Sequence, residues 1–143
     1  MRTARNAAVF LGVLVLVIIG YPIALAEVGS ALVDGRNFEN YFGWFSWPHV
    51  IFAGVAFIVF VIGGALLSRL IASRHAFGWT LLLGLVYGTI RMYFSSASVA
   101  SAREPEEIAW LLQELIVPVL ASCLGAYIYR RYTRQRVNGA KAA

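Results

Sequence analysis

The chain has 143 residues, of which 60% are hydrophobic and 13% are charged, and its formal net charge is +5 at pH 7. This length suits one domain and is too short for a membrane unit joined to a separate soluble domain. Soluble domains are about 45–50% apolar and about 25% charged, so a soluble fold of this size could not bury so much apolar surface. The composition therefore excludes an ordinary soluble protein and predicts an all-α polytopic membrane protein that has the lipid bilayer as a partner.

Four apolar stretches follow one another along the chain. They cover residues 7–26, 48–71, 76–98 and 108–129. Each is near the ~20 residues that a helix needs to cross a ~30 Å hydrocarbon core. The sequence therefore predicts a single membrane domain, residues 1–143, built as a four-helix transmembrane bundle.

Charge alternates between the two ends of these stretches. Arg2 and Arg5 precede the first stretch, and Arg69, Arg74 and His75 connect the second to the third. The other two connections are mainly acidic and contain Glu27, Asp34, Glu39, Glu104, Glu106 and Glu107. Because basic residues that flank apolar spans stay in the cytoplasm, the pattern predicts both termini inside, in the inner membrane of a bacterium.

The segment 130–143 follows the fourth stretch and holds five of the twelve basic residues. We expect a short, mobile cytoplasmic tail that faces lipid headgroups. The positive charges flank apolar spans and do not form a face that could read or stack on bases, so no nucleic-acid partner is expected.

The first stretch has a competing interpretation. Met1–Ala26 has a basic start and ends in Ala24-Leu25-Ala26, which resembles a signal-peptide cleavage site. Cleavage there would leave three spans. The apolar stretch is about 20 residues long, however, whereas the apolar region of a signal peptide has about 7–15. Retention of the first helix is favoured, and cleavage stays as the alternative.

Aromatic residues gather in the segment 37–47, just before the second stretch. They are Phe38, Tyr41, Phe42, Trp44, Phe45 and Trp47. Aromatic rings at helical spacing are typical of a helix lying at headgroup depth on the outer surface. A lid over an outward-facing ligand or lipid pocket is the alternative.

Two ionisable side chains lie well inside the predicted spans, Arg91 in the third and Glu114 in the fourth. At 1.5 Å per residue, Arg91 lies ~21 Å from the inner end of its stretch and so about 9 Å from the outer face, the depth also expected for Glu114. An unpaired charge at that depth is unfavourable by about 2.5–3.5 kcal/mol or more, so we predict that the two side chains pair. The pair either holds the two helices together or belongs to a ligand site or ion pathway.

Small residues share the helical faces of this pair. They are Gly84, Gly88, Ala121 and Gly125. Small residues let membrane helices approach closely, and we expect these faces to pack inside the bundle and not between copies of the chain. Pro118 lacks an amide donor and leaves the carbonyl of Glu114 without its helical partner, which predicts a kink beside the carboxylate.

Other chemistry has little support in the sequence. His49 is predicted near the outer surface, where it can join the polar cluster of Arg91 and Glu114, whereas His75 is predicted near the inner surface. Two histidines so far apart cannot ligate one haem iron, and Cys123 is the only cysteine. We therefore expect no cofactor, no metal site and no catalytic residue.

Function is predicted only as a class. The leading hypothesis is a small non-enzymatic membrane protein that assembles with itself or serves as an accessory subunit of a membrane complex. The alternatives are a small oligomeric channel or transporter that uses the Arg91 and Glu114 cluster, and an enzyme acting on a lipid or isoprenoid at the outer face. The last would use His49 with Arg91 and Glu114.

Overall fold

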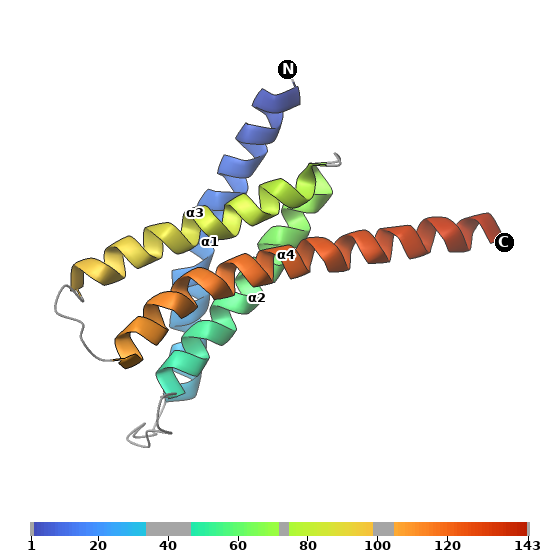
Figure 1. Ribbon diagram of the computed structural model, residues 1–143. Coiled ribbons are helices and arrows are strands. Elements are labelled where there is room, and N and C mark those ends of the chain that lie inside the picture. Colours follow the sequence, from blue (N-terminus) through green and yellow to red (C-terminus); the bar gives the residue numbers. More distant parts are fainter. Residues whose placement is uncertain (1, 34–46, 72–74, 99–104, 143) are drawn as a thin grey trace.

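A computed structural model describes residues 2–33, 47–71, 75–98 and 105–142 of the chain. The regular structure of these residues consists of four helices: α1 (Arg2–Val33), α2 (Trp47–Leu70), α3 (Ala76–Ser98) and α4 (Pro105–Ala142) (Figure 1). The predicted all-α fold is confirmed. Of the aromatic segment 37–47, all but Trp47, the first residue of α2, lies outside the described residues.

Three of the four helices are long and apolar enough to cross a membrane. The apolar parts are Thr3–Val28 in α1, Val50–Leu70 in α2 and Leu111–Gln135 in α4. The third helix has 23 residues, which is ~34 Å of helix and therefore enough length. Its glycines, its polar residues and Arg91 make α3 less apolar than the apolar parts of the other three helices, so a fourth crossing does not follow from composition alone.

Two helices extend beyond the predicted stretches. The first runs through Pro22 to Val33, and α4 runs through Pro118 to Ala142. We predicted residues 130–143 as a short, mobile tail after the last span, and residues 130–142 continue α4 as a helix. The physical reason is that an existing helix adds each further residue without a new nucleation step, and Arg, Gln, Ala and Lys are good helix formers.

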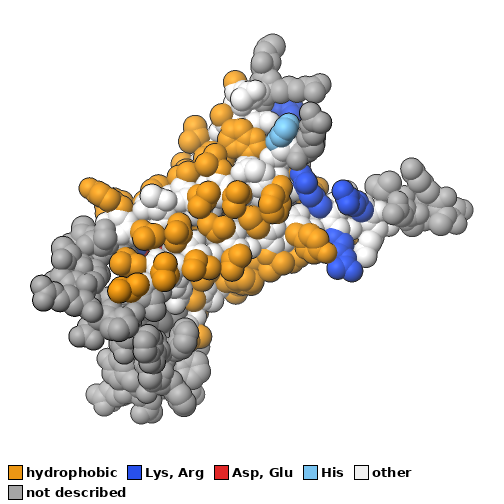
Figure 2. Space-filling model, in the orientation of Figure 1, with side chains coloured by type: hydrophobic (Ala, Val, Ile, Leu, Met, Phe, Trp, Pro, Cys, Tyr) orange, Lys and Arg blue, Asp and Glu red, His pale blue; other side chains and the backbone are white. Residues whose placement is uncertain are grey.

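The fourth helix is the shared element of the bundle. It packs extensively against both α2 and α3, while α1 packs mainly against α2 and less against α3. Figure 1 shows α3 lying along the first half of α4, and the C-terminal part of α4 projecting beyond the other helices. The buried interior includes Phe60, Leu67, Leu83 and Ala121. The flank of the bundle is covered with hydrophobic side chains, as lipid contact requires (Figure 2).

Glycines set the distance between these helices. A Cβ added to Gly84 would lie 2.5 Å from the Cα of Val119, and one added to Gly88 would lie 2.9 Å from the Cα of Leu115. On the other side of α4, a Cβ on Gly125 would lie 2.8 Å from the carbonyl carbon of Val61. Atoms cannot approach so closely, so only glycine fits at these positions. The pair Gly84 and Gly88 therefore packs on α4 of the same chain.

We predict that Gly64→Ala destabilises the fold, because the added Cβ would overlap the backbone of Ser122 on α4. Overpacking of this kind typically lowers the free energy of unfolding by about 1–3 kcal/mol. The matched control is Gly54→Ala in the same helix, where an added Cβ meets no atom within 4 Å. Unfolding by SDS titration in mixed micelles measures both variants, and equal stabilities would contradict the close approach of α2 to α4.

Candidate functional site

An ion pair joins the C-terminal half of α3 to the N-terminal half of α4. Arg91 Nε donates to Glu114 Oε2 at 2.8 Å, and Arg91 Nη2 donates to Glu114 Oε1 at 3.0 Å. Two parallel hydrogen bonds of this kind fix the relative orientation of the guanidinium and carboxylate planes, which a single contact would not do. The Glu114 side chain is 11% exposed, whereas that of Arg91 is 34% exposed.

Aromatic rings from three helices contact one another beside Arg91. The guanidinium carbon of Arg91 lies 5.7 Å from the ring centre of Tyr21 on α1. The ring of Tyr21 contacts that of Tyr87 edge to face at 6.1 Å, and Tyr87 in turn lies 4.6 Å from Phe60 on α2. A cation over a ring face is attracted by the ring quadrupole, and more strongly where water is excluded. Tyr21 therefore links α1 electrostatically to the ion pair.

All four helices meet at a small cavity beside the pair. Its volume is about 20 Å³, and its lining consists of Tyr21, Phe52, Ala53, Ala56, Tyr87, Gln113, Glu114, Val117 and Pro118. A water molecule needs about 10–15 Å³ of such space and several polar partners, so the cavity suits one water. Tyrosine hydroxyls, an amide and a carboxylate are available as those partners.

Pro118 connects this site to the tight contact between α3 and α4. The hydroxyl oxygen of Ser122 lies 2.7 Å from the Pro118 carbonyl and 3.0 Å from the Thr80 carbonyl on α3, so its hydrogen can be donated to either carbonyl. The Glu114 carbonyl, which Pro118 cannot engage as a donor, lies beside Gly88, 3.2 Å from the place where a Cβ would be. The site therefore lies where the backbones of α3 and α4 are in direct contact.

The predicted site residues divide into three groups. Arg91 pairs with Glu114, and Glu114 and Pro118 both line the cavity. The small residues Gly84, Gly88, Ala121 and Gly125 are buried in the helix contacts of α4. His49 lies in α2, but its side chain, like those of the aromatic segment 37–47, lies outside what the structure describes.

Three residues of the site were missed from the sequence: Tyr21, Tyr87 and Gln113. Depth could have identified Tyr21, because its position in the first stretch is also ~21 Å from the inner end, level with Arg91. Tyr87 lies one position before Gly88, and a tyrosine within an apolar stretch carries no separate signal of a polar site. Gln113 precedes Glu114 and offered no separate signal.

The chemistry available at this site is that of polar contacts among largely apolar helices. A carboxylate held by a guanidinium can accept, and a glutamine and two tyrosines can both donate and accept. Within the described parts of the chain, no group of three His, Cys, Asp or Glu side chains gathers in a way that could hold a metal ion. No protein-family model, curated protein or solved structure matches this chain. The function of the site must therefore be argued from its own residues.

We predict that the two halves of the ion pair are energetically coupled. Glu114→Leu alone leaves Arg91 charged and unpaired inside the bundle, which should lower the free energy of unfolding by about 2.5–3.5 kcal/mol. The double variant Arg91→Leu with Glu114→Leu should be more stable than Glu114→Leu, because replacing both charges removes the need to desolvate either. SDS titration of Glu114→Leu, Arg91→Leu and the double variant completes a double-mutant cycle. The coupling is contradicted if the free energy of unfolding lost in the double variant equals the sum of the losses in the two single variants.

Proposed function

We propose that this chain is a four-span protein of a bacterial inner membrane, with both termini in the cytoplasm, that acts as a non-enzymatic subunit of a membrane assembly. The assembly is formed either by copies of the chain or with other membrane proteins. Two parts of the proposal need separate support, the path of the chain through the membrane and the need for a partner.

The path is supported by charge and by helix pairing. The Lys, Arg and His side chains that are visible in Figure 2 gather at one end of the bundle, whereas Arg91 pairs with Glu114 between α3 and α4. Basic residues at one end favour that end for the cytoplasm. The third helix contacts α4 from Thr80 to Gly88, so it runs beside a helix that is long enough to cross. The same depth range for both helices favours four crossings.

This path predicts a cytoplasmic location for both ends of the chain and an outer location for residues 34–46 and 99–104. Reporter fusions that are active only on one side of the membrane, placed at each of these four positions, test it. Activity of a periplasmic reporter at the C-terminus would contradict the proposed orientation. An intact mass that corresponds to a chain beginning at Glu27 would instead indicate cleavage after Ala26.

The observation that carries the assembly proposal is the partial exposure of Arg91. Glu114 takes two of the five N–H groups of its guanidinium, and a third of the side chain is accessible from outside the bundle. In the proposed path this surface lies about 9 Å below the outer face of the hydrocarbon, where exposing a charge to lipid is unfavourable by about 2.5–3.5 kcal/mol. A neighbouring subunit that offers acceptors would remove this cost.

Transport finds less support in the geometry. A path for a solute requires polar side chains along a continuous opening through the bundle, whereas the cavity at Glu114 holds about one water. The close backbone contacts of α4 with α2 and α3 adjoin this cavity at Ser122 and Val119. Polar groups in such a small space serve to fix helix positions.

We predict that the wild-type chain, extracted into nanodiscs directly from its native membrane, has a mass larger than one chain plus lipid. Arg91→Leu with Glu114→Leu keeps an apolar interior but removes the charge that requires a partner, so this double variant should be found as a monomer. Mass photometry and native mass spectrometry measure the masses. The control is Ile62→Ala, a change at a side chain that is 62% exposed and remote from the pair in sequence, which should leave the assembly unchanged. A wild-type monomer in nanodiscs and in mild detergent would contradict the proposal.

A further inference from the structure

The C-terminal part of α4 carries a stripe of exposed side chains that the assembly proposal does not use. Tyr127, Arg131 and Arg134 follow one another at spacings of four and three residues, which places them on one face of the helix. Tyr127 is 55% exposed, and both arginines are exposed. We call these three residues the arginine stripe.

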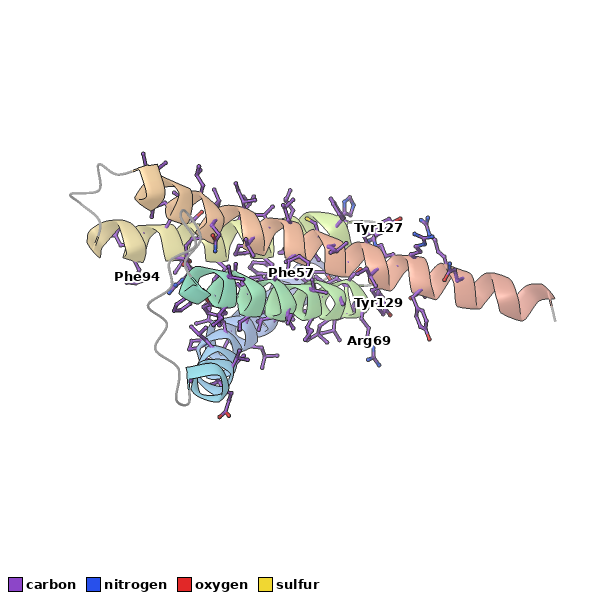
Figure 3. The ribbon with its side chains drawn as sticks, turned by 90° about the horizontal axis from the view of Figure 1, so that it is seen from below. Phe57, Arg69, Phe94, Tyr127 and Tyr129 are labelled. Carbon is purple, nitrogen blue, oxygen red and sulfur yellow. The ribbon has the colours of Figure 1, made fainter. Side chains whose placement is uncertain are left out.

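The level of the stripe along α4 is that of lipid headgroups. Measured from Ile108, where the fourth apolar stretch begins, Arg131 lies ~35 Å along the helix and Arg134 ~39 Å. The hydrocarbon core of a bilayer is about 30 Å thick and the headgroup region adds about 5–7 Å on each side, so Arg131 lies at headgroup level and Arg134 at the outer edge of the headgroups. Arg69, Tyr127 and Tyr129 lie near the same end of the bundle, where α4 extends past α2 (Figure 3). Tyrosine is the residue expected where hydrocarbon gives way to headgroups.

The two positive charges of the arginine stripe favour the binding of an anion. Arg131 and Arg134 are three residues apart on one helical face, and like charges at this spacing destabilise a helix. A phosphate group between them would offset this repulsion, since a guanidinium can donate two parallel hydrogen bonds to phosphate oxygens. The phenol ring of Tyr127, one turn closer to the hydrocarbon, can lie along the first part of an acyl chain.

We propose that the arginine stripe is a binding site for an anionic phospholipid, with the headgroup phosphate between Arg131 and Arg134 and the glycerol end beside Tyr127. A zwitterionic lipid would bring its amine or choline group close to the arginines, so a lipid with net negative charge should be preferred. The proposal requires only that α4 is inserted in a membrane. It holds whichever side the C-terminus faces and whether or not the chain assembles.

The test is equilibrium binding of phosphatidylglycerol to the full-length chain in zwitterionic micelles, followed by native mass spectrometry. Wild type should bind phosphatidylglycerol more tightly than phosphatidylcholine. The preference should fall about five-fold for each arginine that is lost at low salt. It should also weaken as salt is raised, because exposed charges are screened. The variant Arg131→Gln with Arg134→Gln should lose the preference, and Arg131→Lys with Arg134→Lys should keep most of it.

Two controls separate a site from general positive charge. Arg5→Gln removes a basic residue of α1 outside the stripe and should leave the preference unchanged. Inorganic phosphate at matched ionic strength should displace no more lipid than sodium chloride does. Equal losses for Arg5→Gln and the double glutamine variant, or full displacement by inorganic phosphate, would overturn the proposal. An unchanged preference in the double glutamine variant would also overturn it and would favour an acidic protein as the partner of the stripe.

Thermal unfolding in zwitterionic micelles shows whether the double glutamine variant is folded. Its midpoint should match that of the wild type there, because both arginines are exposed in α4. In micelles containing phosphatidylglycerol the wild type should gain stability that this variant does not gain, since a ligand that binds only the folded state stabilises it. A gain of the same size in both proteins would contradict a lipid site at the stripe.

Discussion

Contact between backbones along α4 is the constraint on which the rest of the structure depends. On one side of this helix α3 approaches at Gly84 and Gly88, and on the other α2 approaches at Gly64. In lipid the apolar surface of a helix gains little by leaving its surroundings, so close packing has to supply the association energy. Glycine allows that packing because no side chain separates the helices. This close packing fixes the distance between the helices, and so it sets the geometry of the polar contacts between them.

The ion pair illustrates this dependence. Its two hydrogen bonds, of 2.8 and 3.0 Å, require α3 and α4 to keep one rotation and one vertical register. Gly88 lies almost one turn from Arg91 and contacts Leu115, the residue after Glu114, so the contact that holds the register adjoins the pair. Packing and electrostatics therefore select the same arrangement of the two helices. Such agreement between levels is what gives a sequence a single preferred structure.

The sequence contains enough to predict the helices and the pairing of Arg91 with Glu114. Both follow from quantities that are fixed along a single chain, the apolar length and the rise per residue. The cavity depends on which helices are neighbours, and here the sequence misleads, since α2 packs extensively on α4 although α3 lies between them in the chain. Tyr21 joins the site only because α1 turns that face toward α3. Helix rotation and neighbour order are properties of the assembled bundle.

The end of α4 differs from its predicted form for a related reason. Residues 130–142 have no apolar periodicity, so the pattern alone indicated only a short, mobile extension. Whether a polar segment is helical depends on what precedes it, and here it continues a helix that the bundle already holds. The same continuation aligns Tyr127 with the arginines that follow it.

The contact between Gly64 and Ser122 also has a consequence for synthesis on the ribosome. The two residues are about 60 positions apart, and at about 5–20 residues per second the ribosome needs roughly 3–12 seconds to reach the second after the first. During that interval the face of α2 that will meet α4 has no partner within the chain, although α1 is already available to cover another face through Val17 and Gly63. The nascent protein therefore passes through a stage in which the face of α2 at Gly64 is open to neighbours other than α4.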